Sequence, residues 1–182
     1  AAADLFRCKD PEVMIEGPAG CVAPDTILQG AEMRIEELCR RNIRPVVETS
    51  MGKVKASVPF LKGIAPLYKI RTKNLGASVI ATEDHLIMID GGWRNVSQLK
   101  TGMKIPVMAH PVQVVEDDLV VHLDTVESIE SVGKSPYYDL HVPGAEHYFA
   151  GGLIHHNTGK TRAVLEKCFQ LAEEYPGCRM VF

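Results

Sequence analysis

Two short stretches that lie far apart in the chain could together bind phosphate. The first is Gly17-Pro18-Ala19-Gly20 and the second is Thr158-Gly159-Lys160-Thr161. Joined end to end, they read G-x-x-x-x-G-K-T, the pattern whose backbone amides cradle phosphates and whose lysine reaches them. We therefore predict a phosphate-binding loop that residues 21–157 interrupt. Its nucleotide-binding residues would be Gly17, Gly20, Gly159, Lys160 and Thr161, acting only after the two halves are joined.

The sequence on both sides of the interruption fits such a loop. The run Val13-Met14-Ile15 before it is typical of a short buried strand. Apolar residues after it, including Val164, Leu165 and Phe169, recur at helical spacing. The order strand, loop, helix is the one that a phosphate-binding loop requires, and it appears only when the middle of the chain is removed.

Composition limits the classes of function. The 182 residues are 46% hydrophobic and 24% charged, with a formal net charge of −3, so we expect a globular domain. There is no basic excess to bind nucleic acid, no apolar run long enough to span a membrane, and no signal-peptide pattern. The chain begins with Ala1 rather than Met, which indicates a piece of a longer precursor. We expect a monomer.

The cysteines indicate a reducing compartment. There are five, at positions 8, 21, 39, 168 and 178, and none forms a C-x-x-C pair. An odd number leaves one unpaired in any disulfide scheme. A reducing cytosol therefore fits best.

Several motifs occur in order within the interrupting segment. They are Cys21-Val22-Ala23-Pro24-Asp25-Thr26, Thr82-Glu83-Asp84-His85, Gly92-Trp93 through Thr101-Gly102, Tyr138-Asp139-Leu140-His141-Val142, His147-Tyr148-Phe149 and His156-Asn157. In this order and spacing they resemble the motifs of inteins, which excise themselves from a precursor and join its flanks. The resemblance divides the chain into a host segment 1–20, a splicing domain 21–157 and a second host segment 158–182.

The resemblance implies a mainly β fold, the flattened horseshoe of the Hedgehog/intein (HINT) type. The sequence itself predicts many short strands broken by Gly and Pro, and one short helix over 35–42. The strands are expected at 53–59, 67–72, 78–81, 86–89, 103–107, 119–131, 137–142 and 148–149. Only residues 103–136 separate the middle motifs from the last ones. That is too short for a homing endonuclease, so we expect a minimal, cis-splicing intein.

The resemblance also assigns roles at the upstream junction. Cys21 would attack the carbonyl of Gly20 and take over its acyl group, since a thiolate is strongly nucleophilic and partly formed near neutral pH. His85 would protonate the departing nitrogen of Cys21, and Thr82 would orient the peptide that is cut. Asp139 would coordinate this step with the later ones.

At the downstream junction, Thr158 would be the second nucleophile, and Asn157 would cyclise to release the segment. His156 would protonate the leaving group or polarise the carbonyl, and His147 would help to activate the amide. His155 has no role in this scheme beyond a hydrogen bond. No cofactor is needed for splicing.

Metal and nucleotide are expected only outside the splicing reaction. Cys21, His147, His155 and His156 could bind zinc if the ends of the segment converge, and such zinc would inhibit splicing rather than support the fold. ATP and Mg²⁺ would bind only to the spliced host, with Lys160 on the phosphates and Thr161 on the metal. The joined flanks resemble the ATPase of phage terminase large subunits, which implies the cytoplasm of a bacterial or phage-infected host.

Three other readings stay open at this stage. The chain could be an ATPase fragment that permanently carries an inserted β-domain. It could be a Hedgehog-type autoprocessing domain, which forms the thioester but does not ligate; the ending His156-Asn157-Thr158 argues against this. It could also be a non-catalytic β-rich binding module, which would leave the junction residues unexplained.

Overall fold

The computed structural model describes residues 21–108, 114–115 and 118–157. The chain divides into two compact units, and every described residue belongs to the larger one. The expected host segments 1–20 and 158–182 lie outside the described residues, so their boundaries with the splicing domain stay a prediction.

The described residues are mainly β-strand with one short α-helix, as the sequence predicts. A six-stranded sheet has the spatial order β2 (Met33–Arg34), β1 (Ile27–Leu28), β13 (His147–Ala150), β14 (Leu153–His156), β7 (Leu86–Ile89), β8 (Gly92–Asn95). A four-stranded sheet has the order β6 (Ser78–Thr82), β5 (Phe60–Thr72), β12 (Val121–Asp139), β9 (Lys104–Met108). Two hairpins are β3 (Val46–Thr49) with β4 (Gly52–Lys55), and β10 (Val114–Val115) with β11 (Asp118–Leu119). The helix α2 spans Ile35–Arg40 and a 3-10 turn spans Val96–Gln98.

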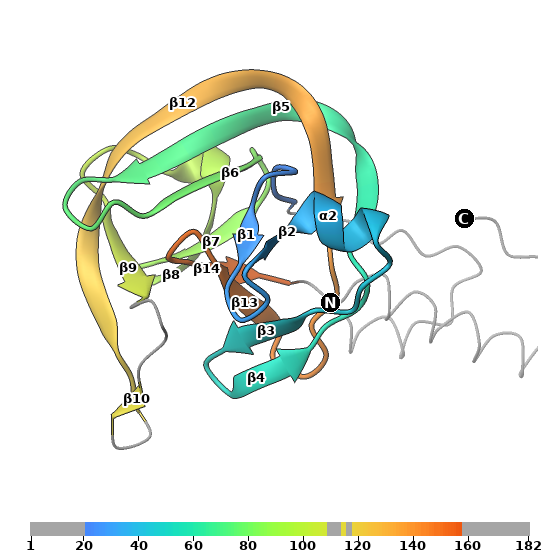
Figure 1. The fold of residues 1–182 in the computed structure, drawn as a ribbon. Helices are drawn as coiled ribbons and strands as arrows, with labels where there is room; N and C mark the ends of the chain where they lie inside the picture. The colour runs from blue at the N-terminus through green and yellow to red at the C-terminus, as the bar shows by residue number, and fades with distance from the viewer. Residues whose placement is uncertain (1–20, 109–113, 116–117, 158–182) are drawn as a thin grey trace, which may run out of the picture. The chain divides into compact units, whose positions relative to one another are not determined.

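The longest strands, β5 and β12, pair antiparallel and form one curved ribbon that arches over the other elements (Figure 1). The pairing is irregular at three places, including the steps Ser131/Gly133 and Tyr137/Tyr138. Gly133 has a φ of 85°, which a glycine adopts without strain. Such irregularities bend a strand and increase its twist, which lets the ribbon curve.

The curvature explains one wrong prediction. The sequence predicts separate strands at 119–131 and 137–142, because Gly133 and Pro136 interrupt the apolar pattern. In the structure β12 runs through both residues, and the glycine marks a bend rather than an end. The sequence did not predict six of the strands in the described residues, which are β1, β2, β3, β8, β10 and β14. The helix begins at Ile35 as expected and ends at Arg40, since Asn42 has a left-handed backbone with φ 53°.

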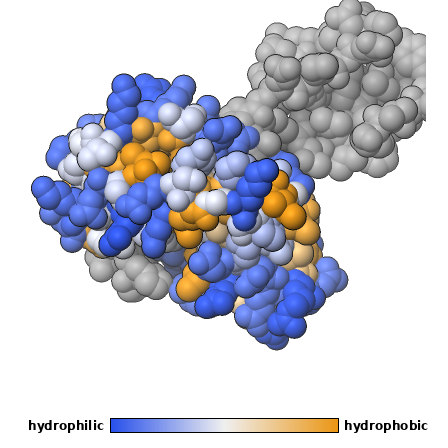
Figure 2. Space-filling view, turned by 90° about the horizontal axis from the view of Figure 1, so that it is seen from above, coloured by the Kyte–Doolittle hydropathy of each residue, from blue (hydrophilic) through white to orange (hydrophobic). Residues whose placement is uncertain are grey.

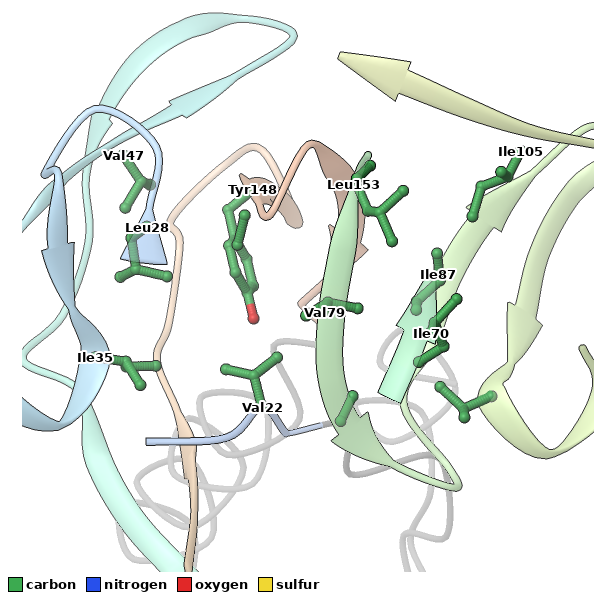
Figure 3. Packing of buried hydrophobic residues seen from close by; sticks show 14 of the residues in the cluster. Val22, Leu28, Ile35, Val47, Ile70, Val79, Ile87, Ile105, Tyr148 and Leu153 are labelled. Carbon is green, nitrogen blue, oxygen red and sulfur yellow. The ribbon is translucent and has the colours of Figure 1, made fainter. Parts of the chain in front are cut away.

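The hydrophobic core lies between the sheets and beneath the helix. Figure 3 shows Leu28, Ile35 and Val47 on one side, Ile70, Ile87 and Ile105 on the other, and Tyr148 between them. The ring of Tyr148 points its hydroxyl toward Val22. Since Val22 is completely buried, the start of the segment is built into the core rather than attached to its surface.

A tight hairpin sets the position of the segment's end. Strands β13 and β14 are joined by Gly151 and Gly152, which both have positive φ, 57° and 79°. Two consecutive positive values are typical of the type I′ turn that suits a twisted hairpin. A Cβ atom on Gly151 would lie 2.1 Å from the carbonyl oxygen of Ser78, so the hairpin packs directly on β6.

The surface carries scattered apolar side chains. The face seen in Figure 2 is mostly hydrophilic, with separate hydrophobic patches. Among the exposed apolar residues are Leu61, Ile64 and Leu123. Isolated exposure of this kind is ordinary for a folded domain. Within the described ranges, no helix is long and apolar enough to cross a membrane.

Candidate active site

The upstream junction is held between two strands. The amide of Val22 donates to the carbonyl of Tyr138 over 3.0 Å, and the amide of Tyr138 donates back over 2.9 Å. On the other side, the amide of Ala23 donates to the carbonyl of Ile80 over 2.9 Å. The chain therefore bridges β6 and β12, and Cys21 is completely buried where the two strands end.

Thr82 contacts Cys21 directly. Its amide donates to the carbonyl of Cys21 over 3.0 Å, and the amide of Cys21 donates to Oγ1 of Thr82 over 3.3 Å. The structure thus brings together two of the residues to which the resemblance assigned roles at the upstream junction. His85 lies one turn further on, where its amide donates to the carbonyl of Thr82 over 3.1 Å.

The thiol of Cys21 is held in its protonated form. Burial, and then the negative charge of Asp139, raise the pKa of Cys21 to about 12. Lys62 opposes this, because its positive charge and its hydrogen bond to the thiol lower the pKa. The expectation of a partly formed thiolate near neutral pH is therefore wrong for this arrangement. A base must take the proton before the sulfur can attack.

Asp139 is paired with a residue that the sequence did not point to. The ammonium group of Lys62 donates to Oδ2 of Asp139 over 3.5 Å, and the amide of Leu140 donates to Oδ1 over 2.9 Å. Across the β5–β12 ribbon, Gly63 pairs with Tyr137 and Leu61 with Tyr138, so Lys62 is the extra residue of a bulge. A bulge redirects a side chain in a way that no sequence pattern reveals.

The downstream junction contacts Leu140, the residue that directly follows the end of β12. The side-chain amide of Asn157 donates to the carbonyl of Leu140, and its backbone amide donates to Glu146 over 2.7 Å. Asn157 is buried. Both edges of the segment therefore converge on residues 138–140: Cys21 through its neighbour Val22, and Asn157 through its own side chain.

His156 and His147 lie on opposite strands of the β13–β14 hairpin, directly paired in register. The ring of His156 packs edge-on against Trp93, with ring centres 4.8 Å apart. For His147, the amide of Ser50 donates to Nε2 over 2.9 Å, so Nδ1 carries the proton and donates to Ala145 over 2.6 Å. These contacts of His147 are with backbone groups and do not include the expected one with Asn157.

The contact that the sequence missed joins His85 to His155. Both rings are completely buried, and Nε2 of His85 lies 2.7 Å from Nδ1 of His155. Nε2 of His155 donates to the carbonyl of Ala150 over 2.9 Å. Burial lowers the pKa of His155 to about 4, although the hydrogen bond to Ala150 raises it. The signal that could have identified His155 is a second histidine directly before His156, in a strand that begins with the apolar pair Leu153-Ile154.

The remaining predicted residues lie beyond the described part of the chain. These are Gly17, Gly20, Thr158, Gly159, Lys160 and Thr161. Among the residues that the structure describes, no group of three His, Cys, Asp or Glu side chains is arranged to hold a metal ion. Cys21 and Cys39 are both outside disulfides.

Solved structures similar to this chain include inteins. A variant of the Ssp DnaB mini-intein is 22% identical with a TM-score of 0.67, and the match covers 80% of this chain and 97% of that one. The DnaX mini intein of Spirulina platensis is 24% identical with a TM-score of 0.59, covering 75% of this chain and 99% of that one. The fold is that of the mini-inteins.

The same mini-intein fold recurs in the DnaB intein of Synechocystis sp. PCC 6803, which is 22% identical with a TM-score of 0.62 over 77% of this chain and 99% of that one. No protein-family profile matches the chain. One curated relative, the replicative DNA helicase DnaB of Rhodothermus marinus, is 29% identical over 102 residues. That match takes in 52% of this chain and 11% of the helicase.

Proposed function

We propose that residues 21–157 excise themselves from the chain and ligate Gly20 to Thr158 by single-turnover autocatalytic splicing. The observation that carries this is the convergence of both edges on residues 138–140. Ligation needs the two junctions within bonding reach, and a fold that holds them there replaces a rare encounter by an effectively intramolecular step. The mini-intein fold supports the same conclusion.

The first step is an acyl shift from nitrogen to sulfur. Asp139 takes the thiol proton of Cys21, since it is the carboxylate whose charge acts most strongly on that sulfur. Sγ attacks the carbonyl carbon of Gly20, the bond from that carbon to the nitrogen of Cys21 breaks, and His85 in its protonated form gives that nitrogen a proton. Thr82 holds the amide of Cys21 in place throughout. The product is a thioester and a free amine.

The following steps transfer the flank and release the segment. The hydroxyl of Thr158 attacks the thioester, forming an ester and returning the thiol of Cys21. Nδ2 of Asn157 then attacks its own carbonyl carbon, which breaks the bond to the nitrogen of Thr158 and leaves a succinimide. Finally, the freed amine of Thr158 takes the acyl group from its own oxygen. His156 would protonate the leaving amine and His147 would support the amide. No cofactor enters any step.

The downstream geometry favours splicing over its rivals. A Hedgehog-type domain needs only the thioester, and a permanent insertion or a binding module needs neither junction. None of these requires a buried asparagine whose amide reaches the carbonyl next to Asp139. Burial also excludes water, which would otherwise hydrolyse the thioester before the second nucleophile reaches it.

For the host, we propose a P-loop ATPase that gains a G-P-A-G-T-G-K-T loop only after splicing. The flanking sequence supports a phage terminase large subunit as that host. ATP and Mg²⁺ would serve only the spliced protein, so micromolar ATP affinity in the unspliced chain would contradict the proposal. We further propose a monomer without a homing endonuclease, acting on its own flanks in a reducing cytoplasm, and inhibited by zinc.

The decisive experiment expresses the full chain between two different tags and weighs the products by mass spectrometry. Splicing yields joined flanks and a free fragment of residues 21–157. Cys21→Ala should abolish ligation, whereas Cys39→Ala, a matched change at a half-buried cysteine, should leave it intact. Asn157→Ala should block release but still allow added thiol to cleave before Cys21. A chain that stays at full length under all conditions would refute the proposal.

A further inference from the structure

The buried pair His85 and His155 determines which ring nitrogen of each histidine carries a proton. A carbonyl oxygen only accepts hydrogen bonds, so Nε2 of His155, 2.9 Å from the carbonyl of Ala150, must be protonated. In the neutral ring, Nδ1 of His155 is then an acceptor. Since Nε2 of His85 lies 2.7 Å from that acceptor, it must be the donor. Neutral His85 is thereby fixed as the Nε2–H form, with its lone pair on Nδ1.

Other features of the fold keep His155 in this form. It is completely buried, and burial favours the neutral ring over the charged one. Its face stacks on the ring of Tyr148, with centres 5.2 Å apart and planes 17° from parallel. Ala150 ends β13 just before the Gly151-Gly152 turn, so the accepting carbonyl belongs to the same rigid hairpin.

We propose that His155 is a positioning residue for splicing: it orients the ring of His85 and makes Nδ1 the nitrogen that exchanges protons at the upstream junction. Nδ1 first takes up a proton, which makes His85 cationic, and then gives it to the nitrogen of Cys21, which returns His85 to the neutral Nε2–H form. This inference rests on the proposed function. A general acid must present one defined nitrogen to the group that it protonates. A histidine gains that definition from the hydrogen bond made by its other nitrogen.

The position of His155 on β14 links the upstream and downstream junctions. It lies on β14, two residues before Asn157, while His85 follows the strand that contacts Cys21. One strand therefore carries both the asparagine of the downstream step and the partner of the upstream acid. A displacement of β14 alters the hydrogen bond to His85, which couples the first cleavage to the packing of the downstream junction.

The competing explanation is that His155 only fills space in the core. It is tested through the protonation form of His85, which mere packing would not control. The full chain carrying Cys21→Ala and Asn157→Ala, which cannot react, is labelled with ¹⁵N-histidine and studied by NMR. Signals of His85 are assigned by their loss in a His85→Ala version. We expect neutral His85 to carry its proton on Nε2. A proton on Nδ1 would overturn the proposal.

Two substitutions extend the NMR test. His155→Val removes the acceptor and should give a mixture of both forms of His85. His155→Asn keeps an acceptor oxygen close to the position of Nδ1 and should preserve the Nε2–H form. If the valine variant does not fold, as judged by circular dichroism, the parent and the asparagine variant still decide the outcome.

The kinetic test uses the reactive chain with Asn157→Ala and measures thiol-induced cleavage before Cys21. General acid–base catalysis contributes about 10²–10⁴-fold, so His155→Val should slow cleavage by about tenfold or more. His155→Asn should stay within about threefold of the parent, as should His122→Val, a control at an exposed histidine on β12. Cleavage of folded His155→Val at the parent rate would overturn the proposal.

The two proposals fail in different ways. A parent chain that never cleaves with thiol contradicts splicing, whatever the protonation form of His85. A parent that cleaves and ligates, together with a His155→Val variant that does so equally well, contradicts only the role of His155.

Discussion

Cys21 and Thr82, 61 residues apart in sequence, hold each other through three hydrogen bonds. The first runs from the amide of Thr82 to the carbonyl of Cys21, and the second from the amide of Cys21 to the hydroxyl oxygen of Thr82. In the third, a longer one, the hydroxyl of Thr82 donates to the carbonyl of Cys21 over 3.5 Å. The second bond holds the very nitrogen that must leave when the upstream peptide breaks. Thr82 therefore orients the nitrogen of Cys21, which is the leaving group, and also holds the carbonyl of Cys21 beside the end of β6.

Replacing Thr82 with valine, which has the same shape but no hydroxyl, should slow thiol-induced cleavage before Cys21. A single hydrogen bond contributes about 0.5–1.5 kcal/mol, which corresponds to roughly two- to tenfold in rate. The measurement uses the Asn157→Ala chain and follows cleavage by mass spectrometry. Thr82→Ser restores the hydroxyl and should recover most of the rate. Equal rates for valine and threonine would rule out this role.

The raised pKa of Cys21 predicts an unusual response to pH. The thiolate absorbs in the ultraviolet more strongly than the thiol, so the folded Asn157→Ala chain should gain almost no thiolate signal from Cys21 up to about pH 10. The signal is read as the difference from a version with Cys21→Ser, which cancels the other cysteines and the tyrosines. The urea-unfolded chain should titrate near the ordinary value of 9.0, because burial and Asp139 no longer act. A titration near pH 9 in the folded chain would contradict the structure.

The same shift predicts how Cys21 affects stability. Its pKa is higher in the folded state than in the unfolded state, so the protonated thiol stabilises the fold below about pH 9, and this contribution is lost as the pH rises toward 12. Urea unfolding of the Asn157→Ala chain should therefore weaken more steeply above pH 9 than that of a version with Cys21→Ser.

The sequence predicts those residues of the site that belong to short local motifs. The junction residues, Thr82 and His85 stand in short motifs, and the structure brings Thr82 to Cys21. Short apolar runs likewise predict a mainly β domain. In each case the information lies within a few neighbouring residues.

Lys62 and His155 could not be predicted in the same way, since their roles depend on contacts across strands. Lys62 approaches Asp139, 77 residues away, because a bulge shifts the register of the ribbon. His155 reaches His85 across 70 residues because a two-glycine turn sets the position of β14. The state of the Cys21 thiol was predicted wrongly for a related reason, since burial is a property of the whole fold.

Asp124 should be a main support of the turn between β5 and β6. Its buried carboxylate accepts hydrogen bonds from the amides of Leu75 and Thr125 and from both nitrogens of Asn74. Burial raises its pKa, but these bonds prevail and hold the pKa well below its usual range. Hydrogen bonds to charged groups are worth about 1.5–3 kcal/mol each, so Asp124→Asn should cost about that much near neutral pH.

The pH dependence of this loss follows from the lowered pKa. The carboxylate stabilises the fold above its unfolded pKa of about 4, and the contribution disappears as the pH falls further. Urea unfolding should therefore give a difference between wild type and Asp124→Asn that shrinks below pH 4. Glu130→Gln, a matched change at an exposed site on β12, should cost little at any pH. A constant difference down to pH 2 would contradict this account.

Lys62→Met should slow the first step of splicing, because it removes the positive charge that lowers the pKa of Cys21. Lys62 is partly exposed, so we expect a loss of about three- to tenfold in thiol-induced cleavage, equivalent to at most about one pKa unit. Added salt should narrow the gap by screening the same charge. Lys62→Arg should retain most of the rate, and Lys134→Met, at an exposed site on β12, should change nothing. Faster cleavage in Lys62→Met would mean that the ion pair restrains Asp139 more than it helps Cys21.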